Sequence, residues 1–125
     1  MTYNDLMIQS LSALLEPGEI LNCPVYGTLM QKGRHWFGFF GLTDRSLLIS
    51  LLEGSTQTIH WTSRVPLDLK AVKVKKSLLL SQYKVRMEFH AGAPCNIRIS
   101  KQVYGIETQG QNLAEFLTRI QETCV

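Results

Sequence analysis

The sequence predicts a mainly β domain, in which about seven short antiparallel strands form a barrel and a helix lies near each end of the chain. Three observations predict this fold class: a length of 125 residues, a hydrophobic content of 45% and an alternation of apolar and polar residues through the middle of the chain. A chain of this length forms one hydrophobic core rather than two, and this apolar content is typical of globular proteins. We therefore expect a single domain over residues 1–125.

The first segment has the periodicity of a helix. Its apolar residues recur at spacings of three and four: Tyr3, Met7, Leu11 and Leu14. This spacing places them on one face of a helix, which we expect over about residues 3–15. Pro17 and Gly18 end the helix, because proline cannot continue it and glycine permits a turn.

The segment from about residue 20 to residue 100 has a period of two, which is typical of strands. Polar turns divide it into seven strands, expected over about residues 21–29, 36–42, 47–52, 57–61, 65–74, 83–90 and 96–99. Ser77–Ser81 connects the fifth strand to the sixth. The third strand is apolar on both faces, so we expect both faces to be covered. Seven strands in so short a segment must curl into a barrel or a sandwich to bury one face.

The fifth strand changes phase part of the way along. Val65, Leu67 and Leu69 alternate with polar residues, and the apolar series then resumes one residue late at Val72. A strand cannot slip by one residue without turning its core face outward. We therefore expect a β-bulge or a corner near Lys70 and Ala71.

The last segment has a continuous apolar stripe at helical spacing, formed by Leu113, Phe116, Leu117, Ile120 and Cys124. We expect a helix over about residues 110–123, and such a stripe suits a helix that closes one open end of a barrel. Two capping-box patterns fit its start: Thr108 with Gln111, or Asn112 with Glu115.

Three motifs stand in a fixed order along the chain. They are Leu-Glu-Pro-Gly-Glu-Ile at 15–20, Gly-Phe-Phe-Gly-Leu-Thr-Asp-Arg-Ser-Leu-Leu-Ile at 38–49 and Val-Pro-Leu-Asp-Leu-Lys-Ala-Val-Lys-Val at 65–74. With the closing helix, they resemble the lead-in, second hairpin and following strand of the pleckstrin-homology-like barrel, in particular its small bacterial members and the related GRAM domains. The likeness covers about residues 12–122.

The resemblance implies a binding or assembly module, because this fold usually carries no catalysis. In phosphoinositide-binding relatives, basic residues from both strands of the first hairpin converge on the phosphates. Here only Lys32, Arg34 and His35 lie in that loop, and Trp36 follows where another basic residue would be needed. Small bacterial members also lack this motif, and some of them assemble into oligomers.

The net charge of +3 conceals a basic middle third. Residues 64–101 contain nine basic side chains and two acidic ones, whereas the segments on either side are net acidic. Two interpretations stay open: solvated strand faces whose lysines discourage edge-to-edge pairing, or an anion-binding patch for a lipid headgroup or phosphate. The candidates for that patch are Lys32, Arg34, Lys73, Lys75, Lys84 and Arg86. Without a motif of stacking aromatics, nucleic acid is not the expected partner.

An aromatic run, Trp36, Phe37, Phe39 and Phe40, coincides with the second strand. Alternate members face the barrel interior, and the others face outward. The outward ones either form an interface with a protein or a second subunit, or are covered by the N-terminal helix. Charged residues make up only 18% of the chain, which favours a surface that a partner covers. A protein partner or a homo-oligomer is therefore expected, with an anionic membrane surface as the alternative.

Motifs for catalysis or metal binding are absent from the sequence. It contains no GxSxG, HExxH or P-loop motif, and its histidines and three cysteines are isolated from one another. We therefore predict no catalytic residue, no metal and no cofactor, and we do not expect an enzyme. Cysteines without a paired spacing fit a reduced, cytoplasmic protein. The first 15 residues lack the basic start of a signal peptide.

Overall fold

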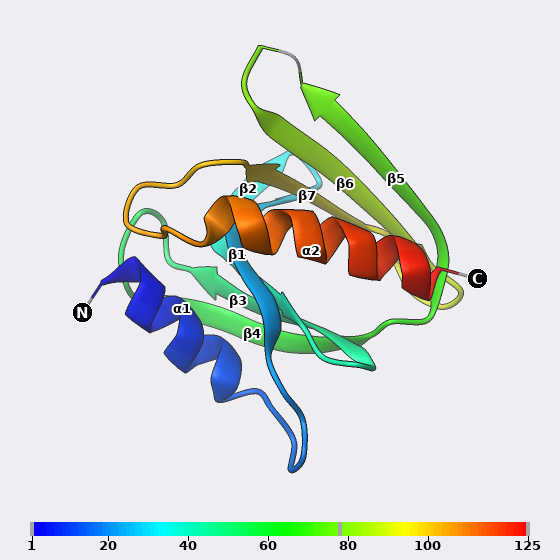
Figure 1. Ribbon diagram of the computed structural model, residues 1–125, viewed down its shortest axis with the longest axis horizontal. Coiled ribbons are helices and arrows are strands. Elements are labelled where there is room, and N and C mark those ends of the chain that lie inside the picture. Colours follow the sequence, from blue (N-terminus) through cyan, green and yellow to red (C-terminus); the bar gives the residue numbers. More distant parts are fainter. Residues whose placement is uncertain (1, 78, 125) are drawn as a thin grey trace.

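The structure is a computed structural model that describes residues 2–77 and 79–124; Leu78, within the connector between the fifth and sixth strands, lies outside the described residues. The chain forms a helix, seven strands and a second helix (Figure 1). Their bounds are α1 Tyr3–Ser12, β1 Asn22–Gln31, β2 Arg34–Leu42, β3 Ser46–Leu52, β4 Ile59–Pro66, β5 Leu69–Ser77, β6 Gln82–Phe89, β7 Cys95–Ser100 and α2 Gln109–Thr123.

The seven strands form one antiparallel sheet in the order β4-β3-β2-β1-β7-β6-β5. The terminal strands β4 and β5 follow one another in the chain, so the sheet curls round to bring them to a common corner. That corner is held by two backbone hydrogen bonds, from Leu67 N–H to the Arg45 carbonyl at 2.9 Å and from His90 N–H to the Asp68 carbonyl at 3.0 Å. The predicted mainly β fold, with about seven antiparallel strands and two helices, is confirmed.

Three register shifts interrupt the ladders of the described residues, and one of them lies between Leu51 and Leu52, where β3 pairs with β4. The pairing of β5 with β6 shifts between Leu69 and Ala71, which confirms the bulge that the change of phase predicts. A second shift lies in β1 between Asn22 and Val25, where Cys23 has a φ of +42°. Pro24 has no N–H to donate to a ladder, so an interruption of the pairing suits it.

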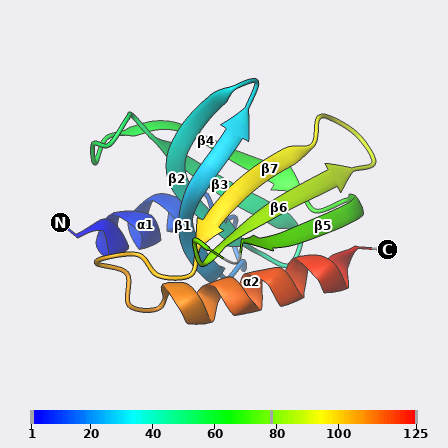
Figure 2. The ribbon, with the colours of Figure 1, turned by 90° about the horizontal axis from the view of Figure 1, so that it is seen from above.

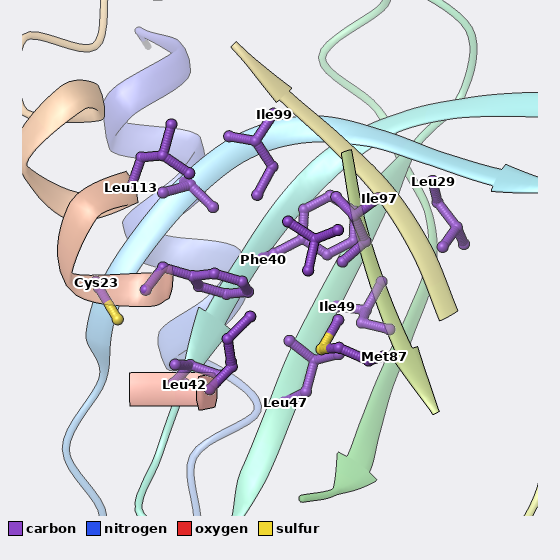
Figure 3. Packing of buried hydrophobic residues seen from close by; sticks show 14 of the residues in the cluster. Cys23, Leu29, Phe40, Leu42, Leu47, Ile49, Met87, Ile97, Ile99 and Leu113 are labelled. Carbon is purple, nitrogen blue, oxygen red and sulfur yellow. The ribbon is translucent and has the colours of Figure 1, made fainter. Parts of the chain in front are cut away.

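One hydrophobic core fills the barrel. Figure 3 shows side chains such as Phe40, Ile49 and Ile97 pointing into it from opposite strands. The helix α2 closes one end and adds three buried side chains to this core: Leu113, Phe116 and Ile120. The predicted apolar stripe is therefore the face on which α2 docks.

The start of α2 differs from the predicted capping boxes. The residue before the helix, Thr108, makes no side-chain capping bond, and its ψ of 2° is far from the extended conformation of a capping residue. The Asn112 amide instead donates to the Pro24 carbonyl at 3.0 Å and to Thr108 Oγ1 at 3.2 Å. These bonds tie the first turn of α2 to the bulge in β1.

A second hydrophobic core lies outside the barrel, beneath α1. This helix packs Leu6, Met7 and Leu11 against Phe39 of β2 and against Leu48 and Leu52 of β3. Both faces of β3 are consequently buried, as the sequence predicts. In Figure 2 the two helices lie along one side of the barrel, and the β1–β2 hairpin and the β6–β7 loop extend from the other. The helix α1 ends at Ser12, three residues earlier than expected, because the backbone tightens into turns before Pro17.

An ion pair holds the segment between α1 and β1. Glu19 accepts two hydrogen bonds from the Arg64 guanidinium, at 2.6 and 3.0 Å, and Arg64 also donates to the Leu14 carbonyl at 2.8 Å. The bonds from Arg64 lower the pKa of Glu19 to about 2. Glu19, the second of the two acidic residues of the first motif, therefore has a structural role here: with Arg64 it fastens the segment that follows α1 to β4.

Candidate anion-binding face

Two rows of side chains cross β5, β6 and β7 on the outside of the barrel. In one row Lys75 lies opposite Lys84, and Lys84 lies opposite Arg98. In the next row Lys73 lies opposite Arg86, which lies opposite Asn96. We call the five cationic side chains of these rows the basic face: Lys73, Lys75, Lys84, Arg86 and Arg98.

The strand pattern itself turns this face outward. Successive residues of a strand point to opposite sides of the sheet. Val85 and Ile97, which lie between the two rows, are buried in the barrel core. The cations on either side of them must therefore point away from the core. Lys73, Lys75 and Lys84 are exposed, and Arg86 and Arg98 are partly buried.

The basic face carries few counter-charges. Arg86 forms an ion pair with Glu88 at 3.3 Å and donates to the Asn96 amide oxygen at 3.2 Å. Within residues 2–77 and 79–124, the other four cations form no ion pair with a carboxylate. The one hydrogen bond of the Arg98 guanidinium to a described residue goes to the sulfur of Met30, at 3.5 Å, which is a weak acceptor. Like charges opposite one another on neighbouring strands repel, so this arrangement is costly unless an anion approaches it.

The structure divides the six candidate cations of the predicted patch into two groups. Lys73, Lys75, Lys84 and Arg86 come together, and Arg98 joins them. Alternation with Ile97 and Ile99 turns Arg98 outward, but only the pairing of β6 with β7 shows that it completes a row.

Lys32 and Arg34 instead lie at the far end of the β1–β2 hairpin, beyond the last pair between β1 and β7, Met30 with Asn96. Lys32 and Gly33 both have positive φ, +48° and +77°, as a two-residue type I′ turn requires. Their position in the turn keeps both Lys32 and Arg34 out of the rows on β5, β6 and β7.

The aromatic run is divided between four environments. Phe40 points into the barrel core, and Phe39 is buried beneath α1, so neither presents surface to a partner. For Phe39 the structure shows coverage by the N-terminal helix, one of the two alternatives for the outward aromatics. Phe37 is 41% exposed and stacks on Tyr26 with ring centroids 6.4 Å apart. Trp36 is partly buried at the open end of the barrel.

That open end holds an apolar cleft of about 320 Å³. Trp36 and His60 both line it and stack on one another, with ring centroids 5.2 Å apart and planes 4° from parallel. Trp61 and Cys95 also line the cleft. Among the described residues, no lysine, arginine or carboxylate lines it, so it suits an apolar group rather than an anion.

Cys23 and Cys95 are poorly suited to act as nucleophiles. Burial raises the pKa of both Cys23 and Cys95 to about 12, so both thiols stay protonated at neutral pH, whereas nucleophilic attack needs the thiolate. Within the described part of the chain, no three His, Cys, Asp or Glu side chains converge as metal ligands would. The helices among those residues are too short or too polar to cross a membrane.

Comparison with known proteins finds similarity among solved structures, whereas no family model and no curated protein matches the chain. The hSac2 domain from the human phosphoinositide phosphatase Sac2 superposes with a TM-score of 0.62 at 13% identity, over 98% of this chain and 83% of that domain. A DUF1696 family protein with a pleckstrin-homology domain from Shewanella loihica gives a TM-score of 0.56 at 12% identity, over 97% of this chain and 92% of that protein. The DH/PH domains of p115-RhoGEF give 0.52 at 12%, over 94% and 34%.

At these identities the likeness establishes the fold and nothing finer. The chain has the pleckstrin-homology-like fold, as the three sequence motifs and the closing helix predict.

Proposed function

We propose that this chain is a non-catalytic binding module that attaches to anionic lipid surfaces through its basic face. The observation that carries the proposal is the unbroken row Lys75, Lys84 and Arg98, three cations side by side on three strands. No carboxylate of residues 2–77 and 79–124 forms an ion pair with any of the three. A surface of anionic headgroups supplies the negative charge that the row lacks. The cysteines favour a cytoplasmic protein, and the cytoplasmic leaflet of a membrane is the one that carries anionic lipids.

The alternative explanation, that these lysines only protect a strand edge, accounts for part of the face. Lysine on an exposed edge discourages pairing with other chains, and β5 is a terminal strand of the sheet. However, β6 and β7 have strand neighbours on both sides. Edge protection therefore does not explain Lys84, Arg86 and Arg98.

The expected affinity is low for one chain. Each Lys or Arg near an anionic surface contributes about 1 kcal/mol, so the five cations of the basic face contribute about 5 kcal/mol. This corresponds to a dissociation constant of about 0.2 mM. Added salt weakens the binding further, because the Debye length falls from about 30 Å at 0.01 M salt to about 10 Å at 0.1 M.

Co-sedimentation with vesicles tests the proposal. We expect the protein to bind phosphatidylcholine vesicles that contain phosphatidylserine, more strongly at low salt than at high salt, and not to bind phosphatidylcholine alone. The variant Lys75→Gln/Lys84→Gln should bind less. The control, Lys32→Gln/Arg34→Gln, removes the same charge from the β1–β2 hairpin and should bind as the wild type. No binding at low salt, or equal losses in both variants, would contradict the proposal.

A second candidate function is the binding of a protein partner or of another copy of the chain. It is supported by Trp61, which is 47% exposed at the rim of the apolar cleft and lies on β4, a terminal strand of the sheet. An exposed aromatic side chain beside an unpaired strand edge suits a contact between chains. Self-association would also strengthen membrane attachment, because several basic faces could then bind one surface together.

A further inference from the structure

The turn between β5 and β6 presents two leucines to solvent. Leu79 is 94% exposed and Leu80 is 65% exposed. Turns are normally built from glycine, proline, asparagine, aspartate and serine, so leucines here serve neither the turn nor the core. Figure 1 shows this turn at the top of the view, clear of both helices.

Lysines surround the turn. Lys75 and Lys84 face each other two residues behind Ser77 and Gln82, the last pair of the hairpin. On the other side, Lys101 N–H donates to the Ser81 carbonyl at 2.9 Å, which places the exposed Lys101 next to the turn. Three lysines thus lie close to an apolar tip.

The spacing along the hairpin matches the layers of a membrane. A strand rises about 3.3 Å per residue, so Lys75 and Lys84 lie about 7 Å behind the last strand pair. Lys73 and Arg86 lie about 13 Å behind it by the same rise. The headgroup region of each leaflet is about 5–7 Å thick. With the tip in the hydrocarbon, the first pair of lysines therefore lies at the level of the headgroups.

We infer that the β5–β6 turn inserts Leu79 and Leu80 into the hydrocarbon of an anionic membrane while the lysines behind it contact the headgroups. This inference rests on the proposed function and deepens it, because it sets the orientation of the protein on the membrane. It also adds an attraction that salt does not screen, since the burial of apolar side chains does not depend on charge.

The experiment compares a tip variant with a matched control on the same vesicles of phosphatidylcholine and phosphatidylserine. Leu79→Ser/Leu80→Ser should weaken partitioning at least about tenfold for each leucine that inserts, and the binding that remains should disappear at high salt. The control Tyr104→Ser changes an equally exposed aromatic in the connection between β7 and α2 and should partition as the wild type. Both variants should melt as the wild type, because the side chains that they change are exposed.

A depth measurement provides a second readout. In a Leu80→Trp variant, the emission added to that of Trp36 and Trp61 should shift to the blue on vesicle binding. Lipids brominated on their acyl chains should quench this added emission. Added emission that is neither shifted nor quenched while the protein is bound would overturn the insertion.

The outcomes separate the inference from the proposed function. If the tip variant binds as the wild type while Lys75→Gln/Lys84→Gln binds less, insertion is wrong and attachment through the basic face stands. If the wild type does not bind the anionic vesicles at low salt, both are wrong. If the tip variant, without lipid, has a lower molar mass in solution than the wild type, the leucines form a contact between chains instead.

Discussion

The side chain of Gln109, the first residue of α2, takes the place of a strand beside Tyr26 of β1. Its Oε1 accepts a hydrogen bond from the Tyr26 N–H at 3.0 Å, and its Nε2 donates to the Tyr26 carbonyl at 2.8 Å and to the Ser100 carbonyl at 3.0 Å. β1 and β7 pair directly only from Thr28 to Met30. One amide thus continues the ladder where the two strands separate, and it joins the closing helix to the barrel.

Replacement of Gln109 should therefore destabilise the fold. Gln109→Ala leaves the N–H and carbonyl of Tyr26 without this partner, and a buried polar group without a partner costs about 1–3 kcal/mol. We expect a lower free energy of unfolding in urea. Gln111→Ala, on the exposed side of the same helix, is the control and should unfold as the wild type. Equal stability of the two variants would show that the amide bonds are dispensable.

Phe116 should contribute more, because it is fully buried between α2 and the barrel core. Truncation of a buried phenylalanine to alanine costs about 3–5 kcal/mol, out of about 5–15 kcal/mol for a typical domain. We expect Phe116→Ala to lower the melting temperature sharply. Gln121→Ala, exposed on the same helix, should leave it unchanged. An unaltered melting curve for Phe116→Ala would mean that α2 does not hold the barrel closed.

The ion pair of Glu19 with Arg64 should make stability depend on acid pH. The pKa of Glu19 is lowered from 4.5 to about 2 in the folded chain, so the folded state binds this proton less readily than the unfolded state. Glu19 therefore stabilises the fold fully above about pH 4.5, and this contribution disappears as the pH falls towards 2.

The measurement is the urea midpoint of unfolding as a function of pH. Glu19→Gln should lower the midpoint at neutral pH and should lose less of it than the wild type between pH 4.5 and pH 2. Glu122→Gln, an exposed glutamate of α2, is the control and should keep the wild-type slope. A wild-type slope in Glu19→Gln would show that the ion pair with Arg64 does not stabilise the fold.

The features that the sequence predicts correctly follow from the spacing of apolar and polar residues that are close together in the chain. The stripe on α2 and the bulge after Leu69 each follow from residues within a few positions of one another, so the spacing alone contains the information. The alternation of Lys84 and Arg86 with buried residues likewise places them on one face. Which residues lie beside them on neighbouring strands depends on the order of the strands in the sheet. The spacing of residues within one strand does not determine that order.

The features that sequence reasoning misses arise from contacts between distant segments. Gln109 lies 83 residues from Tyr26, and an amide in a helix has no pattern that identifies a backbone partner. Leu79 and Leu80 are apolar residues in a connector, and only the shape of the β5–β6 turn shows that no core reaches them. Arg98 enters the basic face through the pairing of β6 with β7.

Self-association should depend on the edge of β4. β4 is a terminal strand of the sheet that the described residues form, and unpaired N–H and carbonyl groups along an edge are a template for another chain. Trp61 on this strand adds exposed aromatic surface. We expect light scattering at high micromolar concentration to give a mass above that of one chain. Trp61→Lys should return the mass to one chain, because a charge at an edge opposes pairing.

A matched control separates this contact from general stickiness. Ile20→Lys introduces the same charge at an apolar side chain that is also exposed, in the connection between α1 and β1, and should leave the molar mass unchanged. If the wild type has the mass of one chain throughout, the homo-oligomer is wrong. Membrane attachment would then rest on a single basic face and its β5–β6 turn, without the gain that several linked faces provide.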